Sequence, residues 1–146
     1  MRTYQVKSFA KINCALNVTG KIARLHKIES IFYFINLYDK ITIKQIDSPD
    51  HKISYFGKFS KNIKKDNTVK RLLNILDKEK LIGNKKFQIK IKKNIPQQAG
   101  LGGGSMNAAS FLNFLIKKKY IKVNQKKITD ISKSIGSDVI LGVDPK

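Results

Sequence analysis

One stretch, "IPQQAGLGGGSMNAASFLNFL" at residues 95–115, constrains this chain more than any other feature. Before it, apolar and polar residues alternate over 87–91, which is typical of a β-strand. Within it, residues 108–116 place apolar side chains on one helical face. The sequence therefore predicts a strand, a glycine-rich loop and a helix in direct succession. The glycines of the loop are Gly100, Gly102, Gly103 and Gly104.

The glycine loop has the chemistry of an anion site. Glycine tolerates positive φ and leaves no Cβ in the way of a ligand, so successive N–H groups can converge. We expect the helix to begin near Ser105 or Asn107, where its dipole and free N–H groups favour phosphate. Two common nucleotide motifs do not fit, because no lysine follows these glycines and Ser105 stands where a third glycine is needed. A turn that serves only packing is the alternative.

The remaining patterns predict a single α+β domain over residues 1–146. Apolar alternation predicts strands, and Asp66 and Asn67 precede an apolar stripe typical of a capped helix. A last helical pattern ends at Gly136. The predicted strands are 10–18, 28–35, 40–46 and 87–91, and the predicted helices cover 69–76, 108–116 and 128–135.

The net charge of +20 comes from 30 Lys and Arg against 10 Asp and Glu. Only Arg2, Arg24 and Arg71 are arginines, which leaves 27 lysines. Arginine is the residue best suited to bidentate phosphate and guanine contacts, so compositional drift is favoured over a nucleic-acid partner. The single Cys14 excludes an intramolecular disulfide and a multi-cysteine zinc site, which suits the cytoplasm. No stretch approaches the ~20 apolar residues of a membrane span.

Four stretches together carry a family resemblance. "PQQAGLGGGSMNAA" at 96–109 resembles the phosphate loop of the GHMP kinases. "SFAKINCALNVTGK" at 8–21, "KDNTVKRLL" at 65–73 and "SIGSDV" at 134–139 resemble other motifs of that family, in the same order. The likeness covers residues 7–142. It departs from the family at Gln98, where a glycine is usual, at Met106, where a serine is usual, and in the lost Asp-Gly turn before His26.

The resemblance implies a fold of the type seen in the second domain of ribosomal protein S5. It also implies a catalytic pair, Lys11 and Asp138, in which Asp138 accepts a hydroxyl proton and Lys11 steadies the transferred phosphoryl group. Asn13, His26 and Phe32 would bind the substrate. ATP, together with Mg²⁺, would bind to Pro96, Gln97, Gln98, Ala99, Gly100, Leu101, Gly102, Gly103, Gly104, Ser105 and Met106.

The implied activity is ATP-dependent phosphorylation of an alcohol. By resemblance, the substrate is a cytidine diphosphate-linked methylerythritol, phosphorylated on its 2-hydroxyl in the non-mevalonate (MEP) route to isoprenoid precursors. Family members continue into a second, C-terminal lobe, whereas this sequence stops at Lys146, so we expect a truncated N-terminal domain. Three alternatives stay open: an inactive remnant, a half completed by a separate chain, and, ranked last, a basic nucleic-acid-binding domain.

Overall fold

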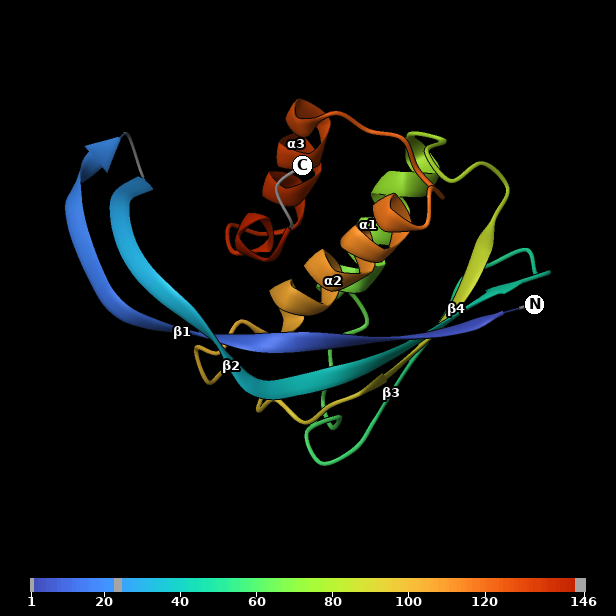
Figure 1. Cartoon of the computed structure of the whole chain (residues 1–146), viewed down its shortest axis with the longest axis horizontal. Coiled ribbons are helices and arrows are strands. Elements are labelled where there is room, and N and C mark those ends of the chain that lie inside the picture. The colour runs from blue at the N-terminus through green and yellow to red at the C-terminus, as the bar shows by residue number, and fades with distance from the viewer. Residues whose placement is uncertain (1, 23–24, 144–146) are drawn as a thin grey trace.

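The computed structural model of the chain describes residues 2–22 and 25–143 (Figure 1). It contains both strands and helices, as the sequence predicts for an α+β domain. In chain order they are β1 (Thr3–Ile22), β2 (Leu25–Ile46), β3 (Lys52–Phe56), α1 (Thr68–Lys78), β4 (Lys86–Lys92), α2 (Gly103–Lys117), α3 (Gln125–Ile135) and the short 3-10 helix η1 (Val139–Gly142).

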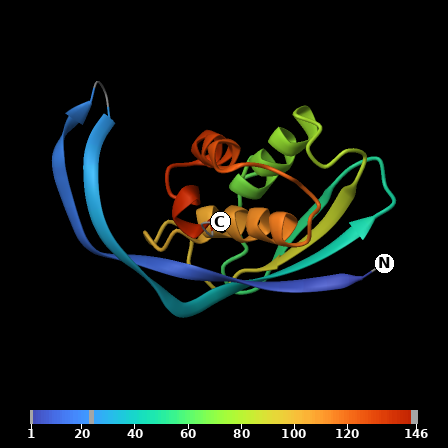
Figure 2. The ribbon, with the colours of Figure 1, turned by 45° about the horizontal axis from the view of Figure 1, so that its top comes forward.

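The strands form one sheet in the order β1-β2-β4-β3. Neighbouring strands are antiparallel except for β3 and β4, which are parallel and are joined through α1. All three α-helices lie on the same side of the sheet, and the opposite face carries no helix (Figures 1 and 2). This arrangement confirms the predicted fold class and leaves one sheet face open.

The first two strands are much longer than predicted. The sequence predicts separate strands at 28–35 and 40–46, but β2 runs through both without a break. Its pairing with β1 shifts register after Phe9, Asn13 and Val18. Such bulges bend and twist a hairpin, and the outer part of β1 and β2 curls away from the sheet toward the helix side (Figure 1). We call this outer hairpin, which comprises β1 from Ala10 onward and β2 up to Ile35, the arm.

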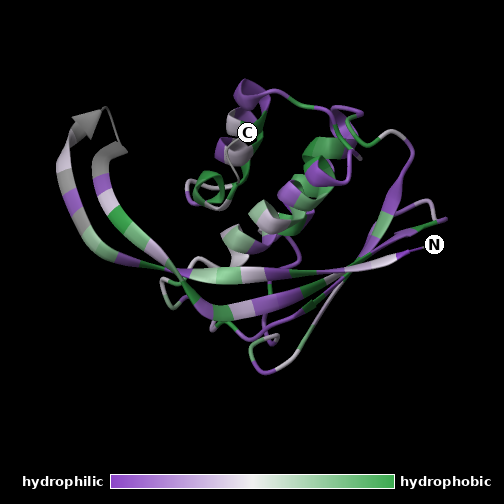
Figure 3. Cartoon of the chain, in the orientation of Figure 1, coloured by the Kyte–Doolittle hydropathy of each residue, from purple (hydrophilic) through white to green (hydrophobic). Residues whose placement is uncertain are grey.

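The core lies between the sheet and the helices. On β4, residues alternate between buried and more exposed positions, as the period-2 pattern predicts. On α1, the apolar stripe faces inward, and the Asn67 side chain accepts a hydrogen bond from the Lys70 N–H, which confirms the predicted helix start. Hydrophobic residues alternate with hydrophilic ones along both kinds of element (Figure 3).

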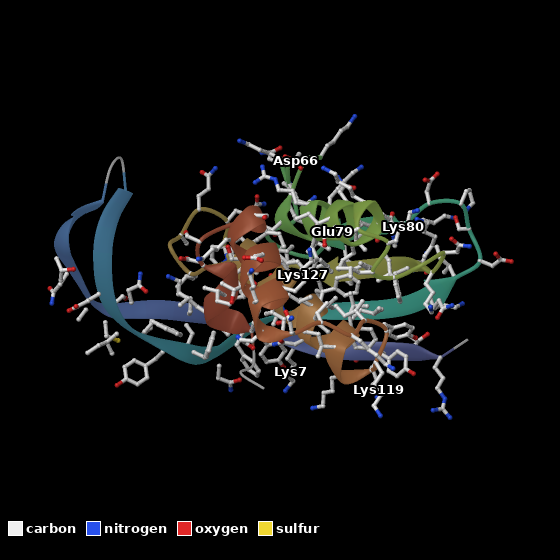
Figure 4. All side chains as sticks on the ribbon, turned by 90° about the horizontal axis from the view of Figure 1, so that it is seen from above. Lys7, Asp66, Glu79, Lys80, Lys119 and Lys127 are labelled. Atoms are coloured by element: carbon white, nitrogen blue, oxygen red, sulfur yellow. The ribbon has the colours of Figure 1, made fainter. Side chains whose placement is uncertain are left out.

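Ion pairs join the helices only at the surface. Lys127 of α3 meets Glu79, the residue that follows α1 (Figure 4). Arg71 of α1 meets Asp66 just before that helix. Exposed pairs of this kind contribute little because solvent screens them. Apolar contact therefore holds the helix layer in place. In the described part of the chain, no helix combines the length and the apolar character needed to cross a bilayer.

Candidate active site

The glycine loop turns directly into α2. Gly102 is the N-cap and has a left-handed φ of 67°, so α2 starts at Gly103, earlier than the predicted start near Ser105 or Asn107. The N–H of Met106 donates to Gly102 O at 2.8 Å. The N–H groups of the first helical turn before Met106 have no carbonyl partner within the helix and point along its axis. The loop therefore offers backbone donors at the positive end of a helix dipole.

A cavity of about 460 Å³ opens at this loop. Ten of the eleven predicted ATP-binding residues, the continuous run 96–105, line it. Met106 does not. Its side chain is buried, and a Cβ added at Gly142 would come within 2.8 Å of the Met106 sulfur. Met106 therefore packs α2 against η1, which explains how a bulky side chain can replace a serine here.

Gln98 has the left-handed backbone that its position demands. Its φ is 57°, close to the 71° of Gly100 two residues later. L-residues with a side chain rarely adopt this conformation, which glycine adopts without strain. The resemblance leads us to expect glycine at this position, and the backbone of Gln98 has a conformation that glycine adopts readily.

Lys11 is fixed to the loop by its backbone and by its side chain. Its N–H, on the outer edge of β1, donates to Leu101 O at 3.1 Å. A Cβ added at Gly102 would lie 3.0 Å from Lys11 Cγ, so glycine is what allows the lysine stem to pass. The side chain of Lys11 is only 5% exposed. A buried lysine needs a partner, and it has two.

The partners of Lys11 Nζ are Asp138 Oδ2 at 3.1 Å and Asn13 Oδ1 at 3.0 Å. Asp138 follows the end of α3 and precedes η1, and its side chain is 40% exposed. The structure thus brings together the predicted catalytic pair, which lies 127 positions apart in the sequence (138 minus 11). The carboxylate is held on one side by the ammonium group and stays accessible to a ligand on the other.

The predicted substrate residues lie on the arm. Asn13 of β1 pairs with Phe32 of β2. Two residues along each strand, Lys11 pairs with Phe34. Phe32 and Phe34 pack edge to face, with ring centroids 5.7 Å apart. His26 pairs through its backbone with Lys21, but its side chain lies outside the described residues. The structure therefore joins Asn13 and Phe32 to the Lys11 side of the site.

A buried acid beneath the loop was not predicted. Asp39 is fully buried, and its Oδ1 accepts hydrogen bonds from the backbone N–H groups of Asn94 and Ile95 at 2.8 and 2.9 Å. Its Oδ2 accepts from Lys93 Nζ and, at 3.1 Å, from Asn107 Nδ2. The acid thus joins β2, the start of the loop and α2. Asp39 falls between two predicted strands, where an acid is typical of a turn, so no local signal reveals it.

Residues near the start of α1 form the other wall of the cavity. Thr68 Oγ1 donates to Gly104 O at 2.6 Å, and the Tyr55 hydroxyl donates to Asn67 Oδ1 at 2.7 Å. Burial raises the pKa of Tyr55 well above its usual value, so the hydroxyl stays a donor. The "KDNTVKRLL" motif could have indicated Asn67 and Thr68, but Tyr55 belongs to β3, which is not among the predicted strands.

We expect Gly102→Ala to destabilise the domain by about 1–3 kcal/mol, because it places a Cβ at positive φ and against Lys11. Denaturant unfolding measures this loss. Gly104→Ala is the matched control, since its Cβ would meet nothing nearer than Thr68 Oγ1 at 3.5 Å, an ordinary contact. Equal unfolding midpoints for the two variants would contradict the described loop backbone.

This combination of fold and loop is that of the N-terminal domain of a kinase. The sequence pattern of the GHMP kinases N terminal domain matches residues 67–144, more than half of the chain, so the chain belongs to the GHMP kinase family. Individual members of the family give a more specific comparison. The chain is 59% identical over 145 residues to the 4-diphosphocytidyl-2-C-methyl-D-erythritol kinase of Pelagibacter ubique, a match that covers 99% of the chain and 52% of the relative.

A kinase of the same name from Anaplasma marginale is 40% identical over 141 residues, covering 95% of the chain and 47% of the relative. Among solved structures, a crystal structure of 4-(cytidine 5'-diphospho)-2C-methyl-D-erythritol kinase superposes with a TM-score of 0.73 at 22% identity, covering 95% of the chain and 48% of that structure. Homoserine kinase from Cytophaga hutchinsonii gives 0.61 at 17% identity, with coverage of 96% and 42%. The chain therefore spans about half the length of the relatives it matches.

Proposed function

We propose that residues 1–146 form the ATP-binding domain of a kinase that phosphorylates the 2-hydroxyl of 4-diphosphocytidyl-2-C-methyl-D-erythritol. The observation that carries the proposal is the contact between Lys11 Nζ and Asp138 Oδ2, 3.1 Å long, beside the start of α2. A lysine and an acid at a phosphate loop are the groups that phosphoryl transfer to an alcohol requires. The names of the curated relatives supply the substrate.

The phosphates of ATP fit the loop because its backbone donors are unused within the helix. In this proposal the N–H groups at Gly103, Gly104 and Ser105 hold the phosphates, and residues 96–105 enclose them. Mg²⁺ bound with ATP would neutralise part of the phosphate charge. Lys11 supplies a fixed positive charge at the edge of the same loop.

Asp138 acts as the proton acceptor. As the hydroxyl oxygen of the substrate bonds to the γ-phosphorus, its proton passes to the Asp138 carboxylate, and the bond to the leaving diphosphate breaks. Lys11 holds this carboxylate in place through the ion pair and so limits its freedom to turn away. Asn13 in turn holds Lys11 Nζ at 3.0 Å.

The arm would receive the substrate. Phe32 offers a ring face or edge for the cytosine, and Asn13 offers a polar contact next to the reacting groups. His26 is the proposed hydrogen-bonding partner of the cytidine part. The exposed, unpaired Cys14 on the arm fits a reducing compartment, and we propose the cytoplasm.

Two measurements on the 146-residue chain test this function. Calorimetry with Mg²⁺ and ATP tests nucleotide binding, and mass spectrometry detects a substrate that has gained one phosphoryl group. Binding with transfer supports the kinase. A chain that binds no ATP contradicts the proposed phosphate site.

A second candidate is a domain that binds ATP but does not transfer phosphate alone. It is favoured by the 40% exposure of the Asp138 side chain, because a site open to water loses the dry setting that strengthens electrostatics. Adding the remaining C-terminal half of that relative as a separate chain distinguishes the two. Transfer that appears only after this addition supports a domain that needs a second chain.

A further inference from the structure

The sheet face opposite the helices is lined with lysines. The lysines of this face are exposed, whereas their neighbours along the strands are more buried. The lysines come from all four strands, and we call their surface the basic face. They are Lys7 of β1, Lys40 and Lys44 of β2, Lys52 of β3, and Lys90 and Lys92 of β4.

Strand register brings these lysines into rows. Lys7 pairs with Lys40, Lys40 pairs with Lys92, and Lys92 pairs with Phe56. Paired residues point to the same side of a sheet, with Cβ atoms about 5 Å apart. Like charges placed directly opposite each other destabilise a sheet. Repulsion between these lysines therefore lowers the stability of the sheet, and a ligand of opposite charge would relieve this repulsion.

The basic face has no acidic partners within the described residues. There, none of its six lysines forms an ion pair, and no Asp or Glu occupies a position paired with them. Four acids, Asp66, Asp77, Glu79 and Asp138, each contact a basic side chain that is not one of these six lysines.

Aromatic rings border the lysines. Phe9 and Tyr38 pair at one end of the face with ring centroids 5.4 Å apart, and Lys7 Nζ lies 4.6 Å from the Tyr38 ring centre. Phe56 ends the lysine row and is 49% exposed. Cationic grooves with exposed rings are the common platform for single-stranded nucleic acids, because lysines neutralise phosphates and rings stack on bases.

We propose that the basic face binds a single-stranded polynucleotide. The sheet is twisted (Figure 2), so a flexible strand can follow it, whereas a flat bilayer would meet only part of the row. The site is separate from the phosphate loop, since none of the six lysines lines the cavity there. Sequence alone ranks this partner last because arginines are few and no basic motif is interleaved with aromatic residues. The six lysines lie up to 85 positions apart (92 minus 7), so only the folded sheet brings them together.

The test measures the fluorescence anisotropy of labelled oligo-uridine with the full chain at several salt concentrations. In a face variant, Lys40, Lys90 and Lys92 are each replaced by Gln. We expect its affinity to fall about tenfold or more and its log-log salt slope to decrease by about 2, because each phosphate contact contributes about 0.7 for single strands. Phe56→Ala is expected to weaken binding about fivefold or more.

The control variant carries the same loss of charge elsewhere. Its changes are Lys78→Gln, Lys122→Gln and Lys126→Gln, at exposed positions in or between the helices. We expect it to bind like the wild type, and we expect excess ATP to displace no oligo-uridine. Thermal unfolding of the face variant should be unchanged or improved, because like charges have been removed, so loss of folding would not explain lost binding.

Three outcomes would overturn the proposal. The first is wild-type binding too weak to detect near physiological salt. The second is equal loss in the face and control variants, which would assign binding to net charge alone. The third is vesicle binding, to phosphatidylcholine with phosphatidylserine, that depends on the face while oligo-uridine binding does not. That result would make the face a membrane surface.

Discussion

Phosphoryl transfer by the Asp138→Asn variant is expected to fall by about 10²–10⁴-fold, the range over which a positioned general base contributes. Asparagine keeps the size of the side chain but cannot accept the hydroxyl proton. ATP affinity should change little, because the proposed phosphate donors are backbone N–H groups of the loop. Single-turnover formation of the phosphorylated product from ATP and 4-diphosphocytidyl-2-C-methyl-D-erythritol measures the effect, with the C-terminal half of the relative added where the chain alone is inactive.

Asp130→Asn is the matched control for this variant. Asp130 lies on the exposed side of α3, eight positions before Asp138 (138 minus 130), so the charge change is equal and the site is untouched. It should transfer phosphate at the wild-type rate. An Asp138→Asn variant that is as active as this control would remove Asp138 from the chemistry.

Asp39→Ala is expected to lower the free energy of unfolding by about 3–5 kcal/mol, the usual cost of leaving one member of a buried ion pair alone. The change strands Lys93, which is 4% exposed, and leaves two backbone N–H groups of the loop entrance without their acceptor. Urea unfolding measures the loss. Asp66→Ala, which breaks the exposed pair with Arg71, should have little effect on the same measurement.

A double variant separates charge from hydrogen bonding at this site. Asp39→Asn with Lys93→Met removes both charges but keeps a side-chain oxygen that can accept from the loop N–H groups. We expect it to be more stable than Asp39→Ala, because no buried charge remains unpaired. A double variant less stable than Asp39→Ala would show that this network does not stabilise the fold through its ion pair.

The parts of the site that were predicted depend on local sequence. A strand, glycines and an apolar helical stripe occur in one continuous stretch, so the loop and α2 follow from backbone preferences. The pairing of Lys11 with Asp138 came from the family motifs, and the structure brings the two side chains within 3.1 Å. Neither residue carries a signal of its own among so many lysines and turn acids.

The parts that were not predicted depend on contacts between distant strands. β2 covers two predicted strands as one, and its bulges arise from pairing with β1. No residue of β2 indicates these bulges in the sequence. Asp39 finds its partners at Lys93 and Asn107, more than 50 positions away, only after the sheet has formed. The rows of the basic face likewise exist only in the register of the folded sheet.

Backbone amide NMR of the ¹⁵N-labelled chain, titrated with Mg²⁺ and ATP, tests the central claim most directly. The account predicts that the largest shifts occur at Leu101, Gly102, Gly103, Gly104 and Ser105, with a further shift at Lys11, whose N–H is bonded to the loop. Saturating ATP that leaves these amides unmoved, or that shifts a different surface, would contradict it.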